Sequence, residues 1–144
     1  LPIYEFNYYF DYEYSKNGDF SGDELKSPGK QMRTVWDLSN NKKPDELKYG
    51  KHPTQKPIKI LTRMIKLSSR QGDIMLAPFA GAGSECVAAK MTGRHYIGFE
   101  TEEEYCKISE ERLAHTEREN GQMDLFRIKQ EETVNDETCD KVER

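Results

Sequence analysis

The stretch that decides the fold spans residues 73–100 and reads DIMLAPFAGAGSECVAAKMTGRHYIGFE. Residues 73–77 and 95–99 are short apolar runs, which are typical of strands buried in a parallel sheet. Residues 84–92, between them, predict a helix with its valine, alanine and methionine side chains turned inward. Because a strand–helix–strand connection is right-handed, these segments predict a βαβ unit whose two strands pair in parallel. The fold class is therefore α/β.

The loop after the first strand is the candidate ligand site. Residues 78–83 read PFAGAG, and Gly81 and Gly83 permit a tight turn and close approach of a ligand to the backbone. Ligands of α/β proteins bind at this carboxyl edge of the sheet, and Glu100, which ends the second strand, can accept the hydroxyls of a ribose there. The dinucleotide pattern GxGxxG requires Gly or Ala where Cys86 stands. A cofactor with adenosine but no pyrophosphate is therefore favoured.

Two further segments flank this unit. Upstream, the stiff turn HPTQKP at residues 52–57 leads into a helix, and Pro57 suits its first turn. Downstream, the T-x-x-E spacing of Thr101 and Glu104 predicts a capped helix that extends to about Arg118. Helical spacing places five residues of the upstream helix on one face: Ile58, Leu61, Met64, Ile65 and Ser68.

The first fifty residues are aromatic and rich in turn residues. Residues 35–38 could form a short strand, whereas residues 16–30 and 39–50 are loop-like. Alternating aromatic residues also predict a half-buried strand near the start: Tyr4, Phe6, Tyr8, Phe10, Tyr12 and Tyr14.

Charge and cysteine content narrow the function classes. The chain of 144 residues has a net charge of −4, but residues 51–99 are net basic between acidic flanks, which suits an anionic ligand or nucleic acid. No run of apolar residues is long enough for a membrane span, so no membrane partner is expected. The three cysteines show no metal-ligand spacing, which predicts reduced thiols in a cytoplasmic protein and no metal site.

The motifs together resemble one enzyme family. Residues 50–57 look like motif X, residues 78–83 like motif I and residues 96–100 like motif II of the DNA amino-methyltransferases, which methylate adenine N6 or cytosine N4. Motif X before motif I is the order of the β group. The resemblance implies the C-terminal, cofactor-binding part of such an enzyme, from a prokaryote or phage. It also implies part of a Rossmann-like S-adenosylmethionine-dependent methyltransferase fold, with three layers and a mostly parallel sheet.

The same resemblance implies the cofactor S-adenosylmethionine and a set of residues that bind it. The glycine loop would wrap the methionine part, Glu100 would hold the ribose, and the HPTQKP turn would approach the methionyl carboxylate. Arg33 and Trp36 stand where the target-recognition region ends and are candidates for DNA contact. The expected cofactor-binding residues are Thr54, Gln55, Lys56, Phe79, Ala80, Gly81, Ala82, Gly83 and Glu100.

Two departures from the family pattern leave an alternative open. Ala77 replaces the usual Asp before Pro-Phe, and the catalytic tetrapeptide with Pro-Pro and an aromatic residue is absent, because no two of the six prolines are adjacent. No catalytic residue is therefore assigned, and this chain alone is expected to be inactive. The alternative is a degenerate or non-catalytic module that binds S-adenosylmethionine.

The resemblance also divides the chain and implies partners. Residues 1–50 would end the target-recognition and catalytic region, residues 51–118 would form the cofactor-binding region, and residues 119–144 would be a polar tail. The implied partners are double-stranded DNA and the N-terminal half of the same protein. A homodimer is left open.

Overall fold

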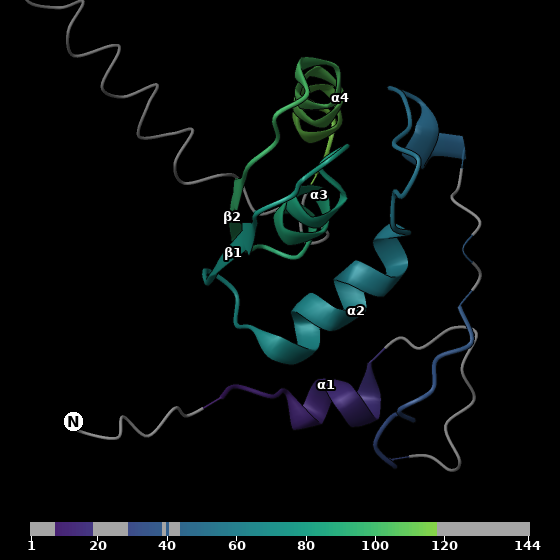
Figure 1. Cartoon of the computed structure of the whole chain (residues 1–144). Helices are drawn as coiled ribbons and strands as arrows, with labels where there is room; N and C mark the ends of the chain where they lie inside the picture. Colours follow the sequence, from purple (N-terminus) through teal and green to yellow (C-terminus); the bar gives the residue numbers. More distant parts are fainter. Residues whose placement is uncertain (1–7, 19–28, 39, 41–43, 118–144) are drawn as a thin grey trace, which may run out of the picture.

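The computed structural model describes residues 8–18, 29–38, 40 and 44–117 (Figure 1). No helix in these residues is long and apolar enough to span a membrane. The elements follow one another as α1 (Tyr12–Asn17), the 3-10 helix η1 (Pro44–Leu47), α2 (Ile58–Ser68), β1 (Ile74–Ala77), α3 (Ser84–Met91), β2 (His95–Gly98) and α4 (Glu103–Ala114).

The βαβ unit forms as the sequence predicts. Strands β1 and β2 pair in parallel, with Ile74 opposite His95 and Ala77 opposite Gly98. Helix α3 connects the two strands and packs on both of them (Figure 1). The carboxyl ends of both strands therefore meet at one edge, directly before the glycine loop and Glu100.

The core lies between the helices and one face of the sheet. Ala88 and Ala89 of α3 are fully buried, and these small side chains allow α2 to approach closely. Met64 and Ser68 are exposed whereas Ile58, Leu61 and Ile65 are buried, so the prediction that all five share one face was wrong for these two. Arg63 is buried instead, and its guanidinium lies 5.0 Å from the ring centroid of Trp36. The buried core residues of α2 and α3 are Ile58, Leu61, Ile65, Val87, Ala88 and Ala89.

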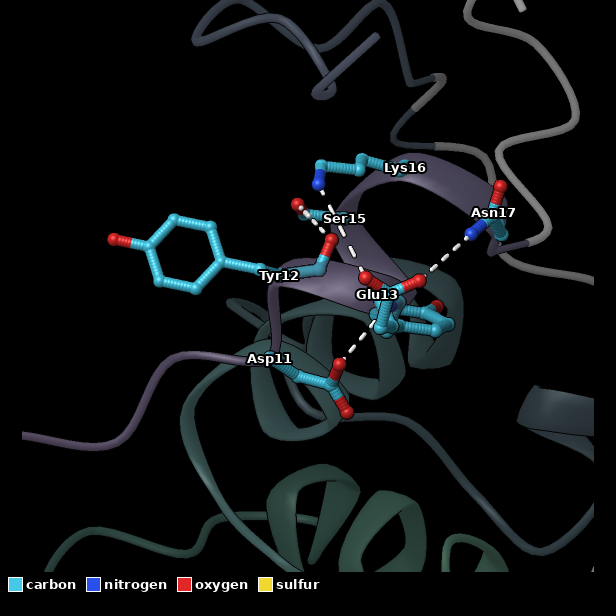
Figure 2. Close-up of polar contacts among 7 residues, drawn as sticks. Asp11, Tyr12, Glu13, Ser15, Lys16 and Asn17 are labelled. Atoms are coloured by element: carbon cyan, nitrogen blue, oxygen red, sulfur yellow. Dashed lines mark hydrogen bonds and ion pairs between the residues drawn. The ribbon is translucent and has the colours of Figure 1, made fainter. Parts of the chain in front are cut away.

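The expected aromatic strand near the start is wrong where the structure describes it, because Tyr12–Asn17 is the helix α1. Figure 2 shows the cause, since the Asp11 carboxylate accepts a hydrogen bond of 2.8 Å from the backbone N–H of Tyr14 and caps the helix. Asn17 also donates to Glu13 at 3.2 Å within the helix. Residues 1–7 lie outside the described residues.

Two other expectations also need correction. Residues 35–38 form no strand, because the Trp36 indole N–H folds back to donate to the Arg33 carbonyl at 2.7 Å. Helix α4 has Glu102 as its N-cap, without a side-chain cap, so the expected capping box does not form. The Glu100 carboxylate instead accepts from the N–H groups of Thr101 and Glu102, just before the first residue of the helix. The helix also ends at Ala114, short of the expected Arg118.

Candidate functional site

The glycine loop and the end of β2 are joined by a hydrogen bond. The backbone N–H of Gly81 donates to Oε2 of Glu100 at 2.8 Å. The other carboxylate oxygen, Oε1, accepts from the N–H groups of Thr101 at 2.7 Å and Glu102 at 3.0 Å. The N–H groups of Glu102 and Thr101, and to a smaller extent that of Gly81, stabilise the charged carboxylate and hold the pKa of Glu100 below its usual value. Partial burial acts in the opposite direction. Glu100 is therefore an ionised and well-oriented group.

The loop needs both of its glycines. Gly81 and Gly83 have φ values of +53° and +71°. Residues other than glycine rarely adopt this left-handed backbone conformation. A Cβ on Gly83 would lie 2.6 Å from the Cβ of Ser109 on α4. The guanidinium of buried Arg112, also on α4, donates to the carbonyl of Ala82 and, at 3.0 Å, to the hydroxyl of Ser84. Helix α4 therefore holds the glycine loop in place through Ser109 and Arg112.

The HPTQKP turn is locked by its own side chains. Gln55 is buried, its amide donates to the carbonyl of Glu46 at 3.0 Å, and its oxygen accepts from the N–H of His52 at 3.3 Å. The Glu46 carboxylate in turn accepts from the N–H of Ile58 at 3.0 Å and so caps α2. Both ends of the Gln55 amide therefore make bonds inside the protein, and these bonds fix the shape of the turn.

His52 brings this turn against the glycine loop. Its ring lies 3.4 Å from where a Cβ on Gly81 would stand, and its centroid is 4.4 Å from that of Tyr105 on α4. The backbone N–H of Thr54 donates to Nδ1 of His52 at 3.3 Å, and the Thr54 hydroxyl lies 3.1 Å from the same nitrogen. Two segments that are far apart in sequence therefore share one surface.

The remaining expected site residues differ in exposure. Thr54 and Lys56 are exposed on the turn, and Phe79 is 93% exposed at the end of β1. Ala80 and Ala82 are buried and give backbone shape rather than side-chain chemistry. This open surface is distinct from a groove of about 700 Å³ between η1 and the helices α2, α3 and α4, because none of that groove's lining residues belongs to the glycine loop or the turn.

The candidate DNA contacts lie apart from the turn in sequence. Arg33 is exposed, and its carbonyl accepts the hydrogen bond from Trp36. Trp36 is half-buried against Arg63. Its ring therefore helps to hold this segment on α2, whereas the Arg33 side chain is exposed to solvent.

Sequence reasoning missed three residues that hold the site. His52 belongs to the HPTQKP turn, but its place in the sequence does not predict its contact with Gly81, and nothing in the sequence marks Glu46 or Arg112. Their contacts join residues that are 12 positions apart for Glu46 and Ile58, and 30 positions apart for Arg112 and Ala82. Only the presence of His52 inside HPTQKP offered a signal in the sequence.

Comparison with known proteins assigns the chain to a family. Residues 4–111 match the N6 and N4 methyltransferase family that is described as DNA methylase. The chain belongs to this DNA methylase family. The HPTQKP turn and the glycine loop, which occur together in this sequence, are also in contact in the fold, through His52 and Gly81.

Several bacterial relatives of this DNA methylase chain support the assignment. The type II methyltransferase M2.DpnII of Streptococcus pneumoniae is 49% identical over 85 residues, which are 59% of this chain and 31% of that protein. M2.LlaDCHI of Lactococcus lactis subsp. cremoris is 44% identical over 106 residues, 74% of this chain and 36% of that protein. The chain therefore spans about a third of the length of these two relatives.

A solved structure supports the fold of the methylase chain. The crystal structure of the M1.HpyAVI–SAM complex is similar with a TM-score of 0.55 and 28% identity. The similarity covers 76% of this chain and 45% of that chain. The chain thus has part of a Rossmann-like methyltransferase fold, as the sequence predicts.

Proposed function

We propose that this chain is the cofactor-binding part of a DNA methyltransferase that uses S-adenosylmethionine. The observation that carries the proposal is the hydrogen bond from Gly81 to Glu100, with His52 packed against the same glycine. This arrangement places the glycine loop, an oriented carboxylate and the HPTQKP turn on one surface. Family membership and the similarity to M1.HpyAVI, which was solved with SAM, support it.

The residues present fit the ribose of this cofactor. A carboxylate offers about four acceptor positions, and three backbone N–H groups use three of them in Glu100. One position remains, on Oε2, for a ribose hydroxyl. The sequence led us to expect that Glu100 would hold both hydroxyls, whereas the geometry favours one direct bond.

The exposed side chains suit the rest of the cofactor. The Lys56 ammonium and the Thr54 hydroxyl are exposed on the turn beside His52, and a methionyl carboxylate prefers such donors. The exposed ring of Phe79 offers apolar surface at the mouth of the loop. Ala77 is 4% exposed, so the position where the family has Asp provides no polar contact here.

The proposed reaction of the longer protein is methyl transfer to an exocyclic amine, N6 of adenine or N4 of cytosine, in double-stranded DNA. The bound cofactor supplies an electrophilic methyl group on sulfur; a carbon–nitrogen bond forms, the carbon–sulfur bond breaks and the amine loses a proton. The chain's own residues bind and orient the cofactor. The groups that align the amine belong to the rest of the longer protein, because this sequence has no Pro-Pro pair.

We also propose how the chain is organised. Residues 51–118 form the cofactor-binding region, residues 1–50 end the region that recognises DNA, and residues 119–144 form a tail. Arg33 and Lys30 are the exposed basic side chains in residues 29–38, and both can reach a phosphate. Because Trp36 packs on Arg63, its role in DNA contact is to position Arg33. The bacterial relatives agree with a cytoplasmic protein.

The second candidate is a binding module that has lost chemistry, which Ala77 and the missing Pro-Pro pair favour. A chimera distinguishes the two, in which residues 8–117 replace the matching region of M2.LlaDCHI. We expect the chimera to transfer tritiated methyl groups to mixed-sequence duplex DNA, and this chain alone to transfer none.

In the chimera, Glu100→Ala should lower transfer at least tenfold at low cofactor concentration, whereas Glu110→Ala, an exposed glutamate on α4, should not. An inactive chimera that still binds the cofactor would support the degenerate module. Equal activity of the two variants would remove Glu100 from the site.

A further inference from the structure

The groove of about 700 Å³ is separate from the candidate cofactor site. Its lining residues come from η1 and the two residues after it, from the helices α1, α2, α3 and α4, and from the two residues that follow α4. We call it the helical groove. Three apolar and three basic side chains give it its character: Ile58, Val87, Met91, Lys48, Lys59 and Lys66.

The helical groove combines an apolar interior with a basic rim. Ile58 and Val87 are buried and belong to the hydrophobic core, whereas Lys48 and Lys59 are exposed. Two carboxylates also line the groove, and that of Glu46 already accepts from the N–H of Ile58. Because five lysine and arginine side chains line it as well, the groove is net basic. An occupant that fits it combines apolar side chains with negative charge.

The chain leaves its described part at this groove. His115 and Thr116 line it, and residues 118–144 lie outside the described residues. Residues 119–126 read ENGQMDLF, with two acidic residues, three large apolar ones and no lysine or arginine. The dipeptide Asn-Gly at residues 120–121 is typical of turns, so the sequence suits a reversal of direction after α4.

The length of this segment is sufficient to cross the groove. An extended chain spans about 3.3 Å per residue, so residues 118–126 reach up to about 30 Å from the end of the described part. Helix α4, which lines the groove, has 12 residues and is about 18 Å long. The segment can therefore pass along the whole groove.

We propose that residues 122–126, Gln-Met-Asp-Leu-Phe, bind in the helical groove of the same chain. In an extended segment Met123 and Leu125 lie on one side and Asp124 lies on the other. The apolar side packs on the buried side chains of the groove, and Asp124 faces the lysines of its rim. The proposal rests on the charge and burial of the groove and not on the proposed function.

Binding in this groove supports the candidate site. Glu46 lines the groove, its carbonyl accepts from the Gln55 amide at 3.0 Å, and its carboxylate accepts from the N–H of Ile58 at 3.0 Å. Arg112 lines the groove as well and donates to the carbonyl of Ala82 in the glycine loop. The bound segment therefore joins η1 to α4 and stabilises the HPTQKP turn and the glycine loop together.

Thiol labelling of the full 144-residue chain tests the proposal without any measurement of activity. Thr62→Cys places a probe in the groove, because Thr62 lines it and is half-buried. Met64→Cys is the matched control, since Met64 is 50% exposed on the same helix and does not line the groove. Both are made with Cys106→Ser and Cys139→Ser. Cys86, which is 3% exposed, reports that each variant is folded as long as it stays unreactive.

Two changes in the tail distinguish the proposed segment from the rest. Leu125→Asp together with Phe126→Asp removes its apolar side chains, and Val142→Asp is the matched control further along the tail. We expect the double change to raise the labelling rate of Thr62→Cys at least fivefold and to leave that of Met64→Cys unchanged. Val142→Asp should change neither rate.

Equal labelling of Thr62→Cys with and without the double change overturns the proposal. A rate for Thr62→Cys that falls as the protein concentration rises also overturns it, because a second copy then supplies the segment. If Val142→Asp raises the rate as much as the double change does, another part of the tail covers the groove and the assignment to residues 122–126 is wrong.

Discussion

The thiol of Cys86 on α3 lies against Gly98 on β2, with Sγ 2.9 Å from the place where a Cβ on Gly98 would stand. Cys86 occupies the position where dinucleotide-binding loops have a small residue for close packing of helix on strand. Here the small residue is on the strand instead. The helix and the strand therefore approach closely although the loop lacks its third glycine.

Gly98→Ala should destabilise the fold by about 1–3 kcal/mol, because the new methyl group would overlap Cys86 and press on Ala80. Cys86→Ala in the same chain should recover part of that loss. Urea unfolding of the wild type, both single variants and the double variant measures the coupling. Strict additivity of the two changes would show that the contact between Cys86 and Gly98 is not close.

Gly83→Ala should cost more stability than Gly72→Ala. Both glycines have positive φ values, +71° and +84°, so both substitutions carry a conformational cost of about 1–2 kcal/mol. A Cβ on Gly72 meets no atom within 4 Å, whereas a Cβ on Gly83 would meet Ser109 at 2.6 Å. Thermal unfolding should therefore separate the two variants, and equal losses would contradict the close contact between the glycine loop and α4.

The βαβ unit could be predicted because its signals are local: two short apolar runs, a glycine loop and a helix between them. The site was predictable only in part. Glu100 and Gly81 follow from their places at the strand ends, but the contact of His52 with Gly81 depends on how the turn folds back over the loop.

The errors in the prediction have physical causes. Tyr12 and Tyr14 continue the alternation of a strand, yet the Asp11 cap and the packing of Tyr12–Asn17 on α2 make this segment a helix. Arg63 lies inside and Met64 outside, because the aromatic ring of Trp36 accepts the buried guanidinium. Neither effect can be read from hydrophobic spacing.

Glu100→Gln should reduce stability at neutral pH but not in acid. The pKa of Glu100 is lowered from 4.5 in the folded chain, so the ionised carboxylate stabilises the fold above about pH 4.5. This contribution is lost as the pH falls through the lowered pKa. The difference in unfolding free energy between wild type and variant should therefore shrink from pH 7 to pH 3, whereas Glu110→Gln should show no such trend. A difference that is equal at both values would contradict the role given to the three N–H donors.

His52→Ala should weaken the binding of S-adenosylhomocysteine roughly fivefold, because the ring no longer supports Gly81. His52→Asn should weaken binding equally but preserve more stability, since the asparagine oxygen can still accept from the Thr54 N–H. Calorimetric titration and urea unfolding of both variants separate support of the loop from support of the turn. Normal affinity in both variants would contradict a role for the ring.

The central claim is that Gly81 and Glu100 together form the S-adenosylmethionine site. Calorimetric titration of this chain with S-adenosylhomocysteine, NAD and ATP tests it most directly, with Glu100→Ala as the variant and Glu110→Ala as the matched control. The account predicts that S-adenosylhomocysteine binds most tightly, that Glu100→Ala lowers its affinity roughly 10- to 100-fold, and that Glu110→Ala leaves it unchanged. Tighter binding of NAD or ATP, or equal affinity of the two variants, would contradict it.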